Sequence, residues 1–363
     1  MRRSYLLLVW TCVLGACADV PPPRIGVAVS TAPAQAAGIA ASELDAGDAG
    51  SFDAVIRASA TGAEQAIGQA YAFVNDPRVL AVVGHGNSAA SLAASQIYNT
   101  AGLVQIAPTT TAPVYGRAGP FSFRLVPGDS LQAAYLSMVR SHHWPASRVA
   151  VVHVNDDYGR GLLRVLRPQL DSVVYEGLYA DNGSALDIER LRDGIAARNP
   201  ELLLWAGRPH VLGLLLPLLR ETLPDIAVVC GDACDAAQVY HNTDGRFTGI
   251  HFVRFTDPAA SDSASRSFRD RYLEVTGEVA SSEALLTYDA VSLVRAALRD
   301  GARTREGVRQ YLTSLGTSRP AFVGLTGSIA FDETGACERS YMLAEVRADG
   351  VSPAEHVAGH GGH

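Results

Sequence analysis

Short runs of aliphatic residues alternate along this chain with longer amphipathic stretches. Residues 148–154, Arg-Val-Ala-Val-Val-His-Val, are nearly all aliphatic, which is typical of a parallel strand buried on both faces. Strands are expected at residues 25–29, 54–58, 79–83, 103–106, 148–154, 172–178, 202–205, 226–229 and 249–253. Helices are expected between them, at residues 61–75, 88–100, 131–142, 161–170, 187–199, 211–222, 263–276 and 282–300. The pattern predicts an α/β fold in which helices cover parallel sheets.

The strand–helix units form two successive series of the same kind, and we find no tandem repeat. Residues 121–127, Phe-Ser-Phe-Arg-Leu-Val-Pro, are expected to cross from one series to the other. A chain of this length exceeds what one hydrophobic core usually serves. We therefore expect two Rossmann-like lobes, each built around a parallel central sheet.

The N-terminus has the pattern of an export signal, with Arg2 and Arg3, an apolar run over residues 5–13, and Leu-Gly-Ala before Cys17. The apolar run is too short to span a bilayer, as in a removable signal peptide. The cysteine after Leu-Gly-Ala resembles the bacterial lipobox, in which the thiol is acylated and the preceding residues are removed. An ordinary signal peptide that happens to contain a cysteine is the alternative.

The lipobox interpretation predicts a signal peptide at residues 1–16, a lipid on Cys17 and a short, stiff tether over residues 17–23. The remaining domain would be exported and anchored to a cell membrane, facing the periplasm or the cell exterior. We expect no second membrane-spanning segment, because no other apolar run approaches twenty residues.

The composition excludes several classes of protein. Loss of Arg2 and Arg3 with the signal changes the net charge from −7 to −9, which argues against nucleic acid, because phosphate binding needs a basic face. All thirty basic residues are arginine. Without lysine, a phosphate-loop nucleotide site and a Schiff-base enzyme are both excluded, and we expect no cofactor.

Three cysteines lie in the exported domain besides Cys17, namely Cys230, Cys234 and Cys337. An oxidising compartment permits one disulfide among them, and three free thiols are the alternative. A metal is not expected, because Cys230 and Cys234 lack the two-residue spacing of a zinc pair and have no partner histidines at ligand spacing.

Polar loops follow the carboxyl ends of four predicted strands, where ligands bind in open parallel sheets. They are residues 84–88, Gly-His-Gly-Asn-Ser; 108–113, Pro-Thr-Thr-Thr-Ala-Pro; 155–161, Asn-Asp-Asp-Tyr-Gly-Arg-Gly; and 230–232, Cys-Gly-Asp. Ser88 is expected to cap the next predicted helix, whose free amides favour a carboxylate or phosphate. Asp232 places a carboxylate at a strand end. The alternatives are that Ser88 is only a helix cap and Asp232 only a solvated side chain.

The order of these four loops resembles the extracellular amino-acid-binding proteins of the leucine/isoleucine/valine type. These are type I periplasmic binding proteins that feed ABC importers. The resemblance covers residues 24–350, and residues 324–332, Gly-Leu-Thr-Gly-Ser-Ile-Ala-Phe-Asp, resemble that family's last crossing. It implies two lobes joined by a three-segment hinge, over residues 24–124 with 255–328 and 125–254 with 329–350, followed by a flexible tail at 351–363.

The resemblance also implies roles for matching positions. Ser88, through its hydroxyl and amide, and Thr111 would hold the α-carboxylate of an amino acid. Asp232 would pair with the α-ammonium, helped by the carbonyl of Thr109. Tyr158 would close over the ligand from the second lobe. This assignment agrees with the residues themselves, because a helix start on one lobe faces a carboxylate on the other.

Two departures from the family leave the ligand's side chain open. Residues 31–51 are rich in alanine and glycine and lack the aromatic loop that usually helps to wall the pocket. Arg208 stands where an aromatic residue is expected, and it would either pair with an acidic or amide group of the ligand or lie at the rim. A branched aliphatic amino acid is therefore only the family default.

An exported amide or ester hydrolase is the rival class. We find no Gly-x-Ser-x-Gly elbow, no His-Glu-x-x-His helix and no catalytic cysteine motif, and His85 and His153 suit structural roles at strand ends. The chain is therefore expected to be a binding protein rather than an enzyme. It would work as a monomer and deliver a small amino acid or similar molecule to an ABC permease. A sensor that presents the same cleft to a receptor or kinase is the alternative.

Overall fold

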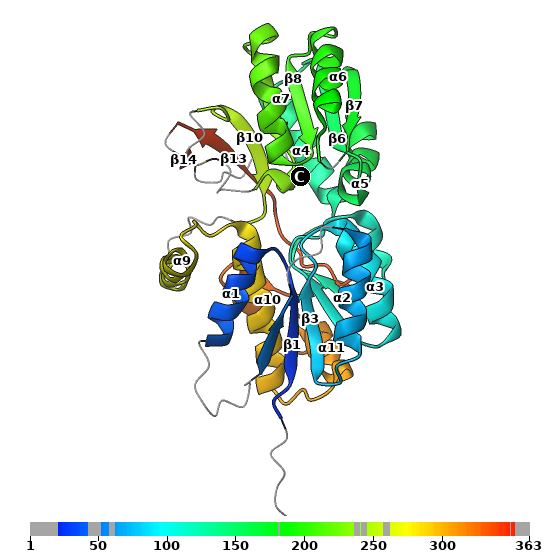
Figure 1. Ribbon diagram of the computed structural model, residues 1–363, viewed down its shortest axis with the longest axis vertical. Coiled ribbons are helices and arrows are strands. Elements are labelled where there is room, and N and C mark those ends of the chain that lie inside the picture. Colours follow the sequence, from blue (N-terminus) through cyan, green and yellow to red (C-terminus); the bar gives the residue numbers. More distant parts are fainter. Residues whose placement is uncertain are drawn as a thin grey trace, which may run out of the picture.

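The chain folds into two lobes, one above the other in Figure 1, and each contains its own β-sheet. The computed structural model describes residues 21–42, 52–57, 62–180, 182–235, 240, 245–256, 262–348 and 350–352. Within these residues, no helix combines the length and the apolar composition needed to cross a membrane. Cys17 and the expected signal peptide lie outside the described residues.

The first lobe contains a parallel sheet with the strand order β2-β1-β3-β4-β5. Its strands are β1 (Arg24–Ala28), β2 (Asp53–Ile56), β3 (Val79–Gly84), β4 (Val104–Ala107) and β5 (Ser122–Arg124). Helices α2 (Ala63–Val74) and α3 (Ser88–Thr100) pack on the face that includes Val82. Helices α1 (Thr31–Ser42), α10 (Ser282–Arg299) and α11 (Arg305–Ser314) pack on the face that includes Val83, because successive side chains of a strand point to opposite faces.

The second lobe contains a sheet with the order β14-β13-β10-β9-β8-β6-β7. Its parallel strands are β6 (Val149–Val154), β7 (Val173–Tyr179), β8 (Leu202–Ala206), β9 (Ala227–Cys230) and β10 (Ile250–Arg254). Strands β13 (Met342–Arg347) and β14 (Gly350–Val351) continue it in antiparallel fashion. The helices around it are α4 (Asp129–His143), α5 (Asp157–Leu166), α6 (Ala185–Ala196) and α7 (Pro209–Thr222).

The lobes are connected where the chain passes from β5 to α4, at the end of β10, and between the β11–β12 hairpin (Phe322–Gly324, Gly327–Ile329) and β13. Helix α9 (Ser263–Thr276) lies at the outer edge of the first lobe (Figure 1). The sheet order 2-1-3-4-5 of the first lobe recurs in the second as β7-β6-β8-β9-β10. In this order the ligand crevice lies at the carboxyl ends of the two strands where the order reverses, which are β1 and β3 in the first lobe and β6 and β8 in the second.

The structure confirms the α/β fold with two parallel sheets, and it places a strand or helix at every predicted position. It corrects three details. Residues 122–124 of the expected crossing form β5, so the crossing begins after Arg124. Residues 31–42 form α1, a helix that is absent from the predicted elements. Val351 belongs to β14, and Ser352 bonds to Glu345, so the expected tail does not begin at residue 351; residues 353–363 lie outside the described residues.

Candidate functional site

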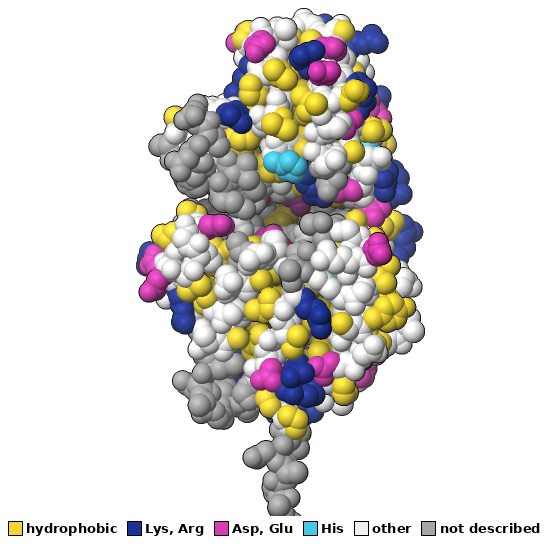
Figure 2. Space-filling model, viewed as in Figure 1, with side chains coloured by type: hydrophobic (Ala, Val, Ile, Leu, Met, Phe, Trp, Pro, Cys, Tyr) yellow, Lys and Arg dark blue, Asp and Glu magenta, His cyan; other side chains and the backbone are white. Residues whose placement is uncertain are grey.

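A cavity of about 210 Å³ lies between the two lobes, at the carboxyl ends of both sheets. Its lining comes from the segments after β3, β4, β6, β8, β9 and β10 and from the start of α10: Gly86, Asn87, Ser88, Thr109, Tyr158, Arg208, Asp232, Ala233, Asp235, Phe255, Ser281, Ser282 and Glu283. The molecule narrows at this level into a visible waist (Figure 2). Pockets for drug-sized ligands usually measure about 300–1,000 Å³, so this cavity suits a smaller molecule.

The first lobe contributes the start of α3 to the cavity. Asn87, and not Ser88 as expected, caps the helix, because the side-chain oxygen of Asn87 accepts a hydrogen bond from the N–H of Ala90 at 2.9 Å. Ser88 is therefore the first helical residue, and its hydroxyl oxygen accepts a hydrogen bond from the N–H of Ala112 at 3.4 Å. Its hydroxyl hydrogen can still be donated to a ligand. Thr109 is held beside it, with its hydroxyl donating to the carbonyl of Gly86 at 3.3 Å.

The second lobe contributes Tyr158 from the start of α5, which follows β6, and Arg208 from the segment between β8 and α7. Asp156 caps α5 by accepting the N–H of Gly159 at 2.8 Å, which fixes the position of Tyr158. The other oxygen of Asp156 accepts from the Arg208 guanidinium at 2.6 Å. That guanidinium lies over the Tyr158 ring, 5.6 Å from its centre. Arg208 thus lines the cavity as half of an internal ion pair.

Asp232 follows β9 and is nearly fully buried, with 9% exposure. Gln132 of α4 holds it at two points: its amide N–H donates to Oδ1 at 2.8 Å, and its oxygen accepts the Asp232 backbone N–H at 3.1 Å. Burial raises the pKa of Asp232 to about 6, although hydrogen bonds from Gln132 and Tyr158 limit the rise. Gln132 also donates to Asp129, whose pKa is raised well above its ordinary value, mainly by burial and then by the charge of Asp232.

The start of α10 brings three polar residues from the first lobe. Ser281 caps the helix through the N–H of Ala284, at 3.2 Å. Ser282 donates its hydroxyl hydrogen to Asp235 of the second lobe, which also forms a buried ion pair with Arg254 at 2.5 Å. Glu283 accepts a hydrogen bond from Ser30 at 3.3 Å through Oε2. Burial raises the pKa of Glu283 to about 7, and the bonds from Ser30 limit the rise.

The structure brings five of the six predicted ligand-binding residues to this cavity: Ser88, Thr109, Tyr158, Arg208 and Asp232. Thr111 is not in the lining. Thr111 is buried, and its carbonyl oxygen accepts hydrogen bonds from the backbone N–H of Asp129 at 2.8 Å and from the Arg124 guanidinium at 3.2 Å. Contact of all six with a ligand stays a prediction.

The histidines and cysteines considered in the sequence analysis form contacts that suit structural roles. His85 is buried against the hydroxyl of Tyr98, at 3.2 Å, and burial lowers its pKa to about 4, which keeps the ring neutral. His153 contacts the carbonyl of Val154 at 2.9 Å. Cys230, Cys234 and Cys337 are free buried thiols, so the alternative without a disulfide holds. In the part of the chain that the structure describes, no group of three or more His, Cys, Asp or Glu side chains is placed to hold a metal ion.

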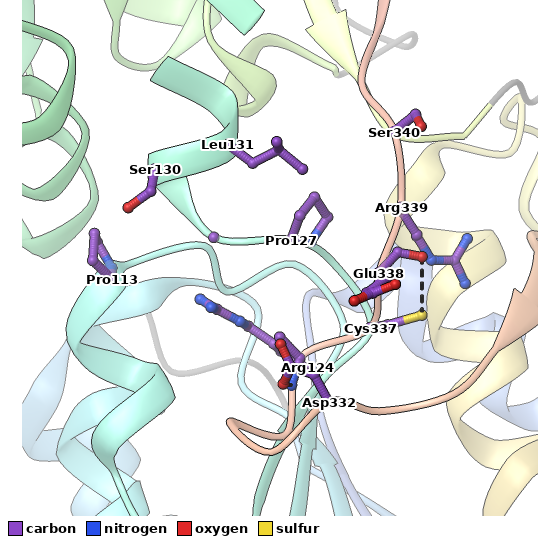
Figure 3. Close-up of a pocket in the computed structure, with 12 residues that line it drawn as sticks. Pro113, Arg124, Pro127, Ser130, Leu131, Asp332, Cys337, Glu338, Arg339 and Ser340 are labelled. Carbon is purple, nitrogen blue, oxygen red and sulfur yellow. Dashed lines mark hydrogen bonds between the residues drawn. The ribbon is translucent and has the colours of Figure 1, made fainter. Parts of the chain in front are cut away.

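A larger cavity, of about 660 Å³, lies beside the connections between the lobes (Figure 3). Arg124 and Pro127 line it from one connection, and Asp332 and residues 336–340 line it from the other. None of the six predicted ligand-binding residues is part of its lining. We therefore take the smaller cavity between the sheets as the candidate site.

Sequence reasoning missed Gln132, Asp235, Phe255 and Glu283. Gln132 and Glu283 lie near the N-termini of predicted helices, where a polar residue usually needs no special explanation. Gln132 is nevertheless fully buried, so a polar residue on the apolar face of its helix was the one available signal.

Sequence comparisons relate this chain to known binding proteins. A family model described as periplasmic binding protein matches residues 26–351. The Leu/Ile/Val-binding protein homolog 1 of Brucella abortus is 26% identical over 282 residues, which cover 75% of this chain and 72% of that protein. An amino acid binding protein of Pseudomonas aeruginosa is 32% identical over 164 residues, which cover 44% of this chain and 43% of that protein.

Solved structures show the same fold. The branched-chain amino acid transporter substrate-binding protein LivJ of Streptococcus pneumoniae, solved with isoleucine, has a TM-score of 0.82 at 22% identity and covers 93% of this chain and 99% of its own. The leucine binding protein LivK of Thermotoga maritima has a TM-score of 0.81 at 22% identity, with the same coverage. Because the family model spans nearly all the described residues, this chain belongs to the periplasmic binding protein family.

Proposed function

We propose that this protein is an extracytoplasmic solute-binding protein that captures a small amino acid or a similar molecule and delivers it to an ABC-type importer. The observation that carries the proposal is the 210 Å³ cavity, which a helix N-terminus enters from one lobe and a buried carboxylate from the other. The names of the relatives and of the solved neighbours, which concern amino acids of this class, support it.

Two sets of lining groups complement the two charges of an α-amino acid. The first amide groups of α3 and the Ser88 hydroxyl are hydrogen-bond donors, which suit the α-carboxylate. Asp232 suits the α-ammonium, with the carbonyl of Thr109 as a second acceptor. Removing this charge pair from water strengthens both contacts. Tyr158 and Arg208 would then cover the ligand from the second lobe.

Ligand capture would proceed by closure of the lobes about the connecting segments. The ligand contacts donors on one lobe and Asp232 on the other, so it binds the closed form more tightly than the open form. The sheet membership of the strands supports lobes made of residues 24–124 with 255–328 and 125–254 with 329–350. A lipid on Cys17 would keep this monomeric domain near its permease.

Calorimetry of the domain from residue 21 onward against the standard amino acids tests this function. We expect one amino-acid class to bind, and Asp232→Asn to weaken that binding by about 2–5 kcal/mol, because a buried ammonium loses its partner. Ser88→Ala should have a smaller effect, because the backbone amides remain. Asp193→Asn is the control, since its side chain is 70% exposed and outside the cavity. Binding of another solute class but of no α-amino acid would refute the carboxylate and ammonium assignments.

A further inference from the structure

Glu283 is a partly buried acidic residue in the cavity that the recognition of an α-amino acid leaves unused. It is the second residue of α10 and lines the cavity on the first lobe, whereas Asp232 lines it on the second. One oxygen of Glu283, Oε2, accepts from Ser30. The other, Oε1, is buried and has no hydrogen-bond partner among the described residues. An unpaired buried carboxylate oxygen is costly unless something else satisfies it.

A helix start explains only part of this arrangement. A glutamate in the first turn stabilises a helix through its interaction with the helix dipole, and it does so equally well when it points to solvent. Ser281 already caps the helix, so Glu283 is not needed for capping. The burial of its carboxylate at the cavity therefore calls for a partner that enters with the ligand.

The charges around the cavity point to the sign of that partner. Four charged side chains line it among the residues that the structure describes: Arg208, Asp232, Asp235 and Glu283. Arg208 is paired with Asp156, and Asp235 is paired with Arg254. Within each pair the two charges neutralise each other. Asp232 and Glu283 are left as two carboxylates that form no ion pair with any described residue, one on each lobe.

A neutral amino acid would balance only one of them. Its ammonium would meet Asp232 and its carboxylate would meet the start of α3, which leaves the charge of Glu283 uncompensated. We propose that the ligand is a basic amino acid, or a close analogue with a second cationic group, and that Glu283 binds this side-chain cation. The inference rests on the proposed function of the same cavity and goes beyond it by naming the ligand class.

The protonation of Glu283 supports this assignment. Its pKa of about 7 means that the ligand-free group is about half protonated at neutral pH, and a bound cation would favour the ionised form. The titratable and charged groups that face it are Arg208, Asp232 and Asp235 across the cavity and Tyr272 from α9. Asp232 ionises near pH 6. Because it is assigned to the α-ammonium, its ionisation would change the affinity for basic and for neutral amino acids by the same factor.

Pairs of ligands that differ only in charge test the inference on the wild-type protein. Lysine is compared with norleucine, and arginine with citrulline, by calorimetry at pH 6 and pH 8. We expect at least one basic member to bind about tenfold or more tightly than its neutral counterpart at pH 8. The ratio should be smaller at pH 6, because protonated Glu283 cannot pair with a cation. The contribution of Asp232 cancels in this ratio.

Glu283→Gln keeps the shape of the side chain and removes its charge, so it should bring the ratio near one at both pH values. Glu274→Gln, at an exposed position of α9, is the matched control and should leave the ratio unchanged. Equal or tighter binding of the neutral members, or a ratio that Glu283→Gln does not alter, would overturn the assignment of Glu283 and leave the proposed function intact. If no α-amino acid bound at all, the proposed function itself would fail.

Discussion

At the scale of single residues, Asp232 is proposed to bind the ligand's ammonium group, but the burial of its charge lowers the stability of the ligand-free folded protein. Burial raises its pKa to about 6 from an ordinary value of 3.8. The folded protein therefore binds more protons than the unfolded chain between about pH 4 and pH 6. The contribution of Asp232 to stability therefore falls as the pH rises through this window, and its full cost is present above it. The difference between the two pKa values corresponds to roughly 3 kcal/mol.

Asp232→Asn should therefore stabilise the ligand-free protein at pH 8, by up to about 3 kcal/mol, because the amide carries no charge to bury. The gain should shrink toward zero as the pH falls to about 4, where the wild-type carboxyl group is also neutral. Urea unfolding at several pH values measures both quantities. A pH-independent difference between the two proteins would show that the stability effect comes from packing and not from ionisation.

The same residue scale shows which parts of the site a sequence can predict. Ser88, Tyr158 and Asp232 follow strands directly, and the carboxyl ends of parallel strands meet at one edge of a sheet. This rule brings Tyr158 and Asp232 together at the edge of the second sheet, whereas Ser88 joins them from the first sheet only because the two lobes face each other. Glu283 reaches the cavity because α10 packs on the first sheet with its start beside the second lobe. That placement depends on tertiary packing, which no local pattern of polar residues encodes.

At the scale of elements, the start of α5 depends on the absence of a side chain at Gly159. A Cβ atom there would lie 2.0 Å from the carbonyl oxygen of Val154 at the end of β6. Gly159→Ala should therefore displace α5 and Tyr158 with it. We expect a destabilisation of about 1–3 kcal/mol together with weaker ligand binding.

Gly68→Ala is the matched control, because Gly68 is exposed in the middle of α2 and a Cβ atom there meets nothing within 4 Å. This change should stabilise the protein by about 0.5–1 kcal/mol, since alanine loses less conformational freedom in a helix. Thermal unfolding of both variants checks the contrast. Equal effects of the two substitutions would mean that α5 has room to move away from β6.

The elements themselves were largely predictable where the sequence has clear aliphatic runs or amphipathic stretches. Strands such as β6, buried at every position, can be recognised from their aliphatic runs. Helix α1 was missed because its sequence, Thr-Ala-Pro-Ala-Gln-Ala-Ala-Gly-Ile-Ala-Ala-Ser, is dominated by small residues and has no polar face. Small residues let it pack closely against α10, with Ala36 and Ile39 buried beside Leu285. The buried face of such a helix can be identified only from the residues that pack against it.

At the scale of the whole molecule, one buried network joins the lobes beside the cavity. Ser282 of the first lobe donates to Asp235 of the second, and it also shares a hydrogen bond of 2.8 Å with Thr256 at the end of β10. The side chains of Asp235 and Arg254 are only 3% and 4% exposed, so their ion pair is well shielded from water. The Ser282–Asp235 bond can form only when the lobes are close. It should therefore favour the closed form even before a ligand binds.

Ser282→Ala should weaken ligand binding by about 1.5–3 kcal/mol, the usual contribution of a hydrogen bond to a charged group. Because this bond forms only in closed molecules, its loss should appear mainly as faster ligand dissociation in stopped-flow measurements. The ligand-free variant should also be more expanded than the wild type in small-angle X-ray scattering, while the ligand-saturated proteins should match. Ser141→Ala, at an exposed position of α4, is the control and should change neither quantity. Slower association with unchanged dissociation would instead mean that Ser282 guides ligand entry and does not hold the lobes together.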